Sequence, residues 1–600
     1  MKIRVADYIA QFFVENGITQ LFSVVGGGAM HLNNAFGLEK RLNVTYNHHE
    51  QASAIAAESY SRVNNKVAAV CVTSGPGGTN ALTGVLCAWQ DNLPMIVVSG
   101  QVRYDITVDS TGLNLRQFGE QEYYIIRSVS PMTKYAVMIT DAKTIKYHLS
   151  KALHLATTGR RGPVWIDVPL NIQGQEIDTD DLIEYVPESD FGAYKADIDN
   201  IVREISSANR PVFIAGSGLR TSGALEKFRE LAEKLNIPVV CPTSTVDYFT
   251  PSEKKYFGMF GTFGGRTGNF IVQNADLLIS LGARLSFKQI GFNFEHFSPQ
   301  SRRIVVDADA EELKKPTIRI DIPICADVAD VVSALLERDI ETKTEEKMQW
   351  MEYCRFLKNR FATSADTERK SISAYRFSEV FFEKADENAV CVLGNNTAAV
   401  SLLQCGIKKK GQRMYGNVNC GTMGYDLPAA IGAAFASGKT VFCLTGEGTL
   451  QMNLQELQTV VHNNLPVKIV VFNNNSYQAI VATQKNFFNG VFCGATNDSG
   501  ISFPSFKKLA DCYDFPFKSI SRSDELEAAV DWLLNIEGRA ILELVQTEPD
   551  PIMPKLSSKK LNDGSIVSPP IDDLFPFLSE EEYEKCRYIN FVKANTETVL

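Results

Sequence analysis

The chain has 600 residues, of which 44% are hydrophobic and 22% charged, and its formal net charge is −10. This composition excludes wholesale disorder, and a mildly acidic chain without a long basic stripe is a poor candidate for non-specific nucleic-acid binding. At roughly 150 residues per domain, the length predicts three or four domains, each able to bury its own core.

The first residues do not resemble a targeting segment. Asp7 and Gln11 interrupt the apolar stretch at the start of the chain, which argues against a signal peptide. The most apolar long window, 427–444, is broken by Pro428 and Lys439, so it falls short of a membrane span. Twelve cysteines without a Cys-x-x-Cys pair indicate reduced, mostly buried thiols. We therefore expect a cytoplasmic protein with neither a membrane nor a nucleic-acid partner.

Short β-rich runs alternate with helical stretches along the chain, which predicts parallel sheets with crossover helices. In the first third the predicted elements are a strand at 67–73, a Gly/Pro loop at 74–78, a helix at 79–90 and a strand at 95–99. In the last third they are a strand at 440–445, a Gly loop at 446–448, a helix at 452–462 and a strand at 467–472.

These two segments share spacing as well as order. Thr73 lies 19 residues before Asn92-Leu93-Pro94, and Thr445 lies 19 residues before Asn464-Leu465-Pro466. Any two strand–helix–strand units look alike to some degree. The alternative is that the first and last thirds are two copies of one α/β domain.

The middle of the chain predicts a third strand series. Its strands are expected at 210–218, 237–241, 275–282 and 303–307. The turn Gly216-Ser217-Gly218 is weak support for a bound dinucleotide, because such turns also serve packing. Linkers are expected at 176–197 and 341–347, and the residues after Glu548 are expected to form a tail lying over the last domain.

The strongest local signal is Gly446-Glu447-Gly448, followed after 24 residues by Asn473-Asn474. A Gly loop that follows a buried strand and opens a helix presents backbone N–H groups to an anion. An acidic side chain in that loop and an amide at the tip of the next strand suit a hard cation with oxygen ligands. The pattern predicts Mg²⁺ bridging a diphosphate.

The segment GEGTLQMNLQELQTVVHNNLPVKIVVFNNNSY resembles the thiamine-diphosphate motif of acetohydroxyacid (acetolactate) synthases and related 2-oxo-acid decarboxylases. The blocks YNHHEQASAIAAESYSR, TSGPGGTNALTGVLCAWQDNLPMIVVSGQV, GPVWIDVPLNI and NCGTMGYDLPAAIGAAFAS extend the resemblance over nearly the whole chain. It implies an α/β fold of three doubly wound parallel-sheet domains. These would be a pyrimidine-binding domain at 1–180, a central nucleotide-binding-like domain at 190–340, a diphosphate-binding domain at 365–550 and a tail at 551–600.

The resemblance also implies roles for individual residues. Glu50 matches the glutamate that shares a proton with the aminopyrimidine ring of thiamine diphosphate, and Met423 matches the residue that bends the cofactor. The Mg²⁺ ligands would be Glu447, Asn474 and the backbone carbonyl of Ser476. The remaining cofactor contacts would be Gly26, Pro76, Asn80, Asn395, Asn396, Thr397, Gly421, Gly446, Gly448, Thr449 and Tyr477.

Further polar residues are candidates for contact with the substrate. Gln121 keeps its register in the family's substrate loop, and either His48 or His49, beside Glu50, could donate a proton to the reacting carbonyl. His31 follows the Gly26-Gly27-Gly28 turn and could reach the substrate. Packing is the alternative for these histidines and for Tyr477.

Three positions depart from the family pattern. The metal-binding acid, usually Asp, is Glu447; the Phe of the Phe-Gln-Glu substrate loop is Glu120; and the Lys of the family's Asp-Leu-Pro-Lys segment is Leu170. The last two lie where the family binds its acceptor and its flavin. The departures therefore favour an acceptor other than pyruvate and an enzyme without FAD.

The function expected is thiamine-diphosphate- and Mg²⁺-dependent decarboxylation of a small 2-oxo acid such as pyruvate, with transfer of the acyl group to an acceptor carbonyl. One alternative is a non-decarboxylating acyloin lyase or diketone hydrolase of the same fold. Another is a catalytically degenerate regulatory paralogue, marked by Glu447. Since the family builds each site from two subunits, a homodimer or homotetramer is expected.

Overall fold

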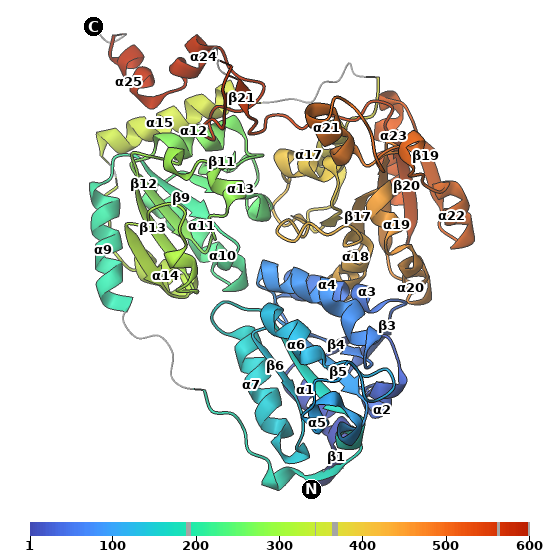
Figure 1. The fold of residues 1–600 in the computed structure, drawn as a ribbon. Helices are drawn as coiled ribbons and strands as arrows, with labels where there is room; N and C mark the ends of the chain where they lie inside the picture. The colour runs from blue at the N-terminus through green and yellow to red at the C-terminus, as the bar shows by residue number, and fades with distance from the viewer. Residues whose placement is uncertain (188–193, 343, 363–369, 561–563, 598–600) are drawn as a thin grey trace. The chain divides into compact units, whose positions relative to one another are not determined.

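The computed structural model describes residues 1–187, 194–342, 344–362, 370–560 and 564–597. These residues contain three six-stranded sheets surrounded by helices, which confirms the predicted α/β class (Figure 1). The chain forms two compact units. One contains the described residues of 1–189, 389–396 and 416–547, and the other those of 190–388, 397–415 and 548–600.

The first sheet is built by the N-terminal residues. Its strands, in spatial order, are β3 (Asn43–Tyr46), β2 (Gln20–Ser23), β4 (Ala68–Val72), β5 (Met95–Gln101), β7 (Pro163–Pro169) and β6 (Tyr135–Met138). All five pairings are parallel, and the central strands are buried without interruption, as expected of a sheet covered by helices on both faces. Its principal helices are α1 (Val5–Glu15), α2 (Met30–Leu38), α3 (Glu50–Asn64), α4 (Pro76–Asp91) and α7 (Ile145–Thr157).

The sheet near the C-terminus repeats this topology. Its strands, in spatial order, are β16 (Arg413–Tyr415), β15 (Val390–Leu393), β17 (Val441–Gly446), β18 (Val467–Asn473), β20 (Ala540–Val545) and β19 (Phe517–Ile520). Numbered along the chain within each sheet, both sheets have the strand order 2-1-3-4-6-5. The shared order supports the prediction that the first and last thirds are copies of one domain. Its principal helices are α18 (Asp426–Ser437), α19 (Glu447–Gln451), α20 (Leu457–His462), α21 (Gln478–Phe487), α22 (Phe506–Cys512) and α23 (Leu526–Asn535).

The central sheet has a different topology. Its strands, in spatial order, are β11 (Tyr256–Met259), β10 (Val239–Cys241), β9 (Pro211–Ala215), β12 (Leu277–Leu281), β13 (Arg302–Asp307) and β14 (Ile322–Cys325). This is the order 3-2-1-4-5-6 of dinucleotide-binding folds, as the predicted strand series suggested. Helices of the same unit are α9 (Tyr194–Ser207), α11 (Leu225–Leu235), α12 (Arg266–Asn274), α14 (Val328–Leu336), α15 (Glu345–Arg360), α16 (Ala374–Lys384) and α17 (Thr397–Cys405).

Helix α3 lies between the N-terminal sheet and the sheet near the C-terminus, and it joins these two sheets of the first unit. Figure 1 shows α3 and α4 beside α18, and these helices pack closely. Small side chains permit the approach: a Cβ at Gly432 would lie 2.0 Å from the Ala56 carbonyl oxygen, and one at Gly84 would lie 2.5 Å from Ala54 Cβ. The same helix carries a buried ion pair, in which Arg62 contacts both Glu58 and Asp91.

Two segments differ from their predicted secondary structure. Residues 176–178, placed in a linker, form β8 (Glu176–Asp178), which pairs antiparallel with β1 (Lys2–Arg4) and buries Ile177 between exposed Glu176 and half-buried Asp178. Residues 188–193 of that linker lie outside the described residues. The helix expected at 452–462 begins late, because α19 ends at Gln451, Asn453 donates its side-chain amide to the Gly424 carbonyl, and α20 begins only at Leu457.

The position predicted for the C-terminal tail is wrong beyond Pro554. Leu556 donates its backbone N–H to the Thr262 carbonyl, and Tyr353 donates its hydroxyl to the Cys586 carbonyl. Ile571 and Cys586 belong to the buried core of the central domain. The tail, which includes α24 (Glu580–Lys585) and α25 (Tyr588–Glu597), therefore packs on the central domain because that domain leaves an apolar helix face for its aromatic side chains.

The ion pair on α3 leads to a stability prediction. Arg62→Ala should lower the free energy of unfolding by about 3–5 kcal/mol, because it leaves the Glu58 and Asp91 carboxylates buried without their cation. Urea unfolding followed by circular dichroism measures the change. Arg41→Ala, which removes an exposed pair with Glu39, is the control and should leave the unfolding curve unchanged. Equal effects of the two substitutions would contradict the assigned role of Arg62.

Candidate active site

The site residues lie at the carboxyl ends of parallel strands in two sheets, where open α/β sheets place their ligands. Glu50 follows β3 and opens α3, and its side chain is 9% exposed. The Asn80 amide, on α4, donates to Glu50 Oε2 over 3.0 Å. Glu50 and Asn80, both assigned from the sequence, are thus brought together at one edge of the first sheet.

The segment 74–78 lies against the predicted substrate loop. Gly75 has φ 58°, and a Cβ there would lie 2.4 Å from the Gln121 carbonyl oxygen, so only glycine fits between the two loops. Pro76 follows as the first residue of α4. Gln121 is exposed, whereas Glu122 is buried and accepts the backbone N–H groups of Phe118 and Gly119. Glu122 therefore fixes the loop that presents Gln121.

The histidines occupy positions with their own local partners. His49 caps α3, since its Nδ1 accepts the backbone N–H of Gln51 at 3.1 Å. His31 lies on α2, with its ring near Gly174 and its Nδ1 3.4 Å from the Arg4 guanidinium. Gly26 packs against Thr73 at the end of β4. Their predicted contacts with substrate or cofactor stay predictions.

The second group of residues gathers at the edge of the C-terminal sheet. Asn395 and Asn396 follow β15, and Asn395 donates its amide to the Gly421 carbonyl. Gly424 donates its backbone N–H to the Thr449 hydroxyl over 2.8 Å. Thr397 opens α17. The predicted diphosphate residues thus converge where β15 and β17 end.

Gly448 is required by a close approach of side chains. A Cβ at Gly448 would lie 2.2 Å from Tyr477 Cε1 and 3.1 Å from Met423 Cε. The glycine therefore lets Met423 and Tyr477 close over the start of α19. The sequence placed these three residues at one site, and in the structure the side chains of Met423 and Tyr477 both lie beside Gly448.

Glu447 is the acidic residue of the candidate metal centre. It is 2% exposed, and its Oε1 accepts backbone N–H groups from Asn474 and Ser476, each at 3.0 Å. Asn474 Oδ1 accepts the Ser476 hydroxyl at 2.6 Å. Burial raises the pKa of Glu447 to about 7, against the lowering effect of these hydrogen bonds.

Two buried carboxylates near these residues were missed by the sequence analysis. Asp426 accepts the hydroxyls of Thr445 and Thr449, and burial raises its pKa. Glu456 accepts the Asn47 amide and the His48 backbone N–H, each at 2.9 Å, and so fixes the turn before Glu50. Asp426 lies in the quoted GYDLP block, but no spacing rule distinguished either residue from a helix-surface acid.

The donor set fits a magnesium diphosphate. Carboxylate, amide and carbonyl oxygens from Glu447, Asn474 and Ser476 are the ligands that Mg²⁺ takes in proteins, and it shares its shell with phosphate oxygens. Among the described residues, no group of three or more His, Cys, Asp or Glu side chains gathers as a metal site. Gly446 and Gly448 lie at the end of β17 and the start of α19, and a helix N-terminus is where proteins commonly bind phosphate.

Three family models match the chain. They are the N-terminal TPP binding domain of thiamine pyrophosphate enzymes at residues 3–121, the central domain at 198–335 and the C-terminal TPP binding domain at 393–544. TPP is thiamine diphosphate. All three lie within the domain boundaries that the sequence predicts. Within the described residues, no helix is long and apolar enough to cross a membrane.

Similar curated proteins extend over most of the chain. A probable acetolactate synthase large subunit from Methanocaldococcus jannaschii is 30% identical over 87% of this chain and 88% of its own length. The acetolactate synthase isozyme 3 large subunit of Escherichia coli is 29% identical over 87% of this chain and 91% of its own. A chloroplastic acetolactate synthase 1 from Zea mays is 28% identical, covering 92% and 87%.

The contact at Gly448 leads to a second prediction. Gly448→Ala should lower the free energy of unfolding by roughly 1–3 kcal/mol, because the new methyl group overlaps the Tyr477 ring. Adding Tyr477→Ala should relieve most of that loss, which urea unfolding of the single and double variants measures. Gly27→Ala, whose Cβ would meet nothing within 4 Å, is the control. An equal cost of Gly448→Ala with and without Tyr477 would contradict the contact.

Proposed function

Because the chain belongs to the thiamine pyrophosphate enzyme family and resembles acetolactate synthase large subunits along most of its length, we propose that this thiamine-diphosphate-dependent carboligase/decarboxylase acts on a small 2-oxo acid, pyruvate first among them. It would release CO₂ and transfer the remaining acyl group to an acceptor carbonyl. The observation that carries this proposal is the buried Glu50, held by Asn80, in the same unit as the Glu447–Gly448 loop.

Thiamine diphosphate, when bound, supplies the carbon nucleophile and the electron sink for loss of CO₂. The chain supplies the proton acceptor. Asn80 engages Glu50 Oε2 and so orients the carboxyl, which assigns Oε1 to proton exchange with a ring nitrogen. Gly77 lies beside this oxygen, since a Cβ there would lie 3.6 Å from Oε1. Glu50 thus acts as the proton relay of the proposed reaction.

Glu447, Asn474 and the Ser476 carbonyl would hold Mg²⁺. The amides of Asn474 and Ser476 occupy Glu447 Oε1, so the cation would meet Oε2. This arrangement absorbs the extra methylene that Glu447 has relative to the family's aspartate. A cation bound there would keep the buried carboxylate ionised, which its raised pKa shows to be costly without one.

The acceptor side differs from the family pattern at exposed Glu120 and half-buried Leu170. Losing an aromatic side chain and a cation removes groups that would stack on a flavin or attract a second 2-oxo acid. We therefore propose that the acceptor is a molecule other than pyruvate and that the enzyme does not bind FAD. Gln121, exposed beside Gly75, is the residue proposed to meet the acceptor.

The assembly proposed is a homodimer or homotetramer. Support comes from α21 and the residues after it, which expose the large apolar side chains of Ile480, Phe487, Phe488, Val491 and Phe492 next to the Mg²⁺ half of the site. Large apolar side chains exposed together in one segment are typical of a subunit interface. Twelve free cysteines support a reducing, cytoplasmic location.

The role of Glu50 is tested by Glu50→Gln. We expect CO₂ release from pyruvate to fall by about 10²–10⁴-fold, because the amide cannot exchange the proton, while thiamine diphosphate still binds in calorimetric titration. Glu15→Gln, an exposed glutamate at the end of α1, is the control and should keep full activity.

The outcomes separate the alternatives. Retained activity in Glu50→Gln would remove this residue from the mechanism. Cofactor binding by the unaltered protein without CO₂ release from any of a panel of 2-oxo acids would favour the acyloin lyase or diketone hydrolase. No binding of thiamine diphosphate with Mg²⁺ would favour the regulatory paralogue. Mass analysis of the products would identify the acceptor.

The metal centre is tested by two substitutions at one position. Glu447→Gln should weaken Mg²⁺-dependent binding of thiamine diphosphate at least about tenfold, equivalent to about 1.4 kcal/mol, because an anionic ligand is lost. Glu447→Asp, which restores the family's residue, should retain binding. Calorimetric titration at fixed cofactor and varied Mg²⁺ measures both. Equal binding by the glutamine and aspartate variants would place the cation elsewhere.

A further inference from the structure

A buried carboxylate of the C-terminal domain contacts the turn that precedes Glu50. Glu456 is fully buried and is the last residue of the short helical turn η9 (Leu454–Glu456). Its Oε1 accepts the backbone N–H of His48 and its Oε2 accepts the side-chain amide of Asn47, each over 2.9 Å. The reaction proposed for Glu50 assigns no role to this carboxylate.

The donors around Glu456 require a carboxylate rather than an amide. The Thr459 hydroxyl donates to Oε2 at 2.6 Å, beside the Asn47 amide, and the His48 N–H occupies Oε1. Both oxygens must therefore accept hydrogen bonds. An ionised carboxylate does so, whereas the NH₂ group of a glutamine only donates. Because a buried donor without an acceptor is costly, hydrogen bonding accounts for glutamate at this position.

The turn that this carboxylate holds determines where α3 starts. Asn47 is also fixed within its own domain, since its backbone N–H donates to the Ser23 carbonyl at 2.9 Å and its Oδ1 accepts the Ser53 hydroxyl at 3.1 Å. His49 then caps α3, and Glu50 is the first residue of the helix. Asn47 thus connects β2, the first turn of α3 and the buried carboxylate, three residues before Glu50.

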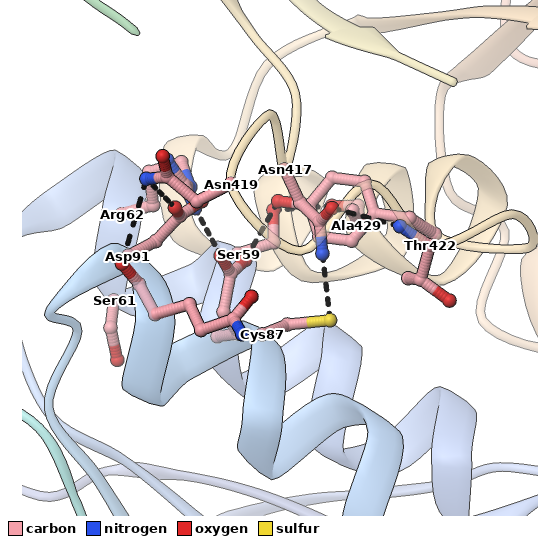
Figure 2. A network of polar contacts seen from close by, with 12 residues as sticks. Ser59, Ser61, Arg62, Cys87, Asp91, Asn417, Asn419, Thr422 and Ala429 are labelled. Carbon is pink, nitrogen blue, oxygen red and sulfur yellow. Dashed lines mark hydrogen bonds and ion pairs between the residues drawn. The ribbon is translucent and has the colours of Figure 1, made fainter. Parts of the chain in front are cut away.

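Different contacts hold the other end of α3. Ser59 donates its hydroxyl to the Ala429 carbonyl at 2.6 Å, and Arg62 pairs with Asp91 (Figure 2). Ser59 lies nine residues after Glu50, which is roughly 13 Å along the helix axis. The contacts of the turn at 47–49 therefore hold the start of the helix.

We propose that Glu456 is a positioning residue for Glu50. By holding the turn at 47–49, it places the Glu50 carboxyl, oriented by Asn80, where the proton is exchanged. This inference rests on the proposed function, because it assigns Glu456 a part in presenting Glu50 to thiamine diphosphate. Proton transfer needs the two atoms within hydrogen-bond reach, and a displacement of about 1 Å can cost about 10²-fold in rate. Glu456 acts through Glu50 and has no cofactor contact of its own assigned to it.

Exchange of the thiazolium C2 proton of bound thiamine diphosphate tests this role. The full-length protein with thiamine diphosphate and Mg²⁺ is mixed with D₂O, quenched in acid and examined by proton nuclear magnetic resonance. Glu456→Gln should slow the exchange about 10–100-fold, because its NH₂ group faces a donor and the turn shifts. The affinity for thiamine diphosphate in calorimetric titration should stay unchanged.

A reciprocal substitution provides the rescue. In Asn47→Asp/Glu456→Gln the new amide donates to the new carboxylate, which still accepts the Ser53 hydroxyl, so fast exchange should return. Asn47→Asp alone brings two carboxylates together and should slow the exchange. Glu537→Gln, at an exposed glutamate of the same domain, is the control and should leave it unchanged. Urea unfolding of the cofactor-free variants should show the same pattern, with the midpoint lowered in each single Asn47 or Glu456 variant and regained in the double variant.

The outcomes distinguish this inference from the proposed function. Equal C2 exchange in Glu456→Gln and the unaltered protein, or no recovery in the double variant, would overturn the role of Glu456 and leave the proposed function standing. No binding of thiamine diphosphate by the unaltered protein would overturn both. Should Glu456→Gln fail to fold, Asn47→Ala removes the contact from its other side, and unchanged exchange in that variant would equally overturn the role.

Discussion

The close packing of α3 between α4 and α18 is the constraint on which the candidate site depends. Helix α3 begins at Glu50, so any shift of the helix moves the proposed proton acceptor. Its contact face consists largely of alanine and serine, and Gly432 brings the α18 backbone within reach of the Ala56 carbonyl. A methyl group added at that contact would overlap the neighbouring backbone, since protein interiors are packed to near crystal density. In the sequence block that contains Glu50, the side chains on the contact face of α3 are therefore restricted in size, just as Glu50 is restricted in chemistry.

Buried charge completes this constraint. The Arg62 guanidinium forms ion pairs with the Glu58 and Asp91 carboxylates, and Tyr425 donates its hydroxyl to Glu58 at 2.7 Å. The ionic cluster therefore joins α3, α4 and the start of α18. Such clusters add little net stability compared with apolar packing, but they tolerate few alternative registers. Hydrogen bonds from Asn419 and Asn417 extend the same contact to the turn before Met423 (Figure 2). Polar contacts thus align α3 and α4 with α18 and the turn before it, and small side chains allow these helices to pack closely.

The sequence predicted the strands well because buried parallel strands are continuous apolar runs, and β4, β5, β17 and β18 begin within two residues of their predicted starts. It failed where a tertiary contact overrides local pattern. The late start of the helix predicted at 452–462 goes with the contact of Asn453 with the distant Gly424 carbonyl. The position of the tail depends on an apolar face of the central domain. Site residues for which the resemblance itself implies a role, such as Glu50, were predicted. Glu456 was not, because its role depends on an amide 409 residues away.

The duplicated topology explains how one fold provides the two different halves of the candidate site, one at Glu50 and one at Glu447. Both sheets have the order 2-1-3-4-6-5, so each presents a strand–helix turn at the same edge. In the first copy the turn after β4 is Thr73–Gly75, which brings α4 and Asn80 to a carboxyl and suits proton exchange with a base. In the second copy β17 ends at Gly446 and α19 begins directly at Glu447, and the amides and acid at this junction suit phosphate and cation. The scaffold fixes where the two turns lie, and a few residues in each turn give one edge the proposed proton acceptor and the other the proposed diphosphate site.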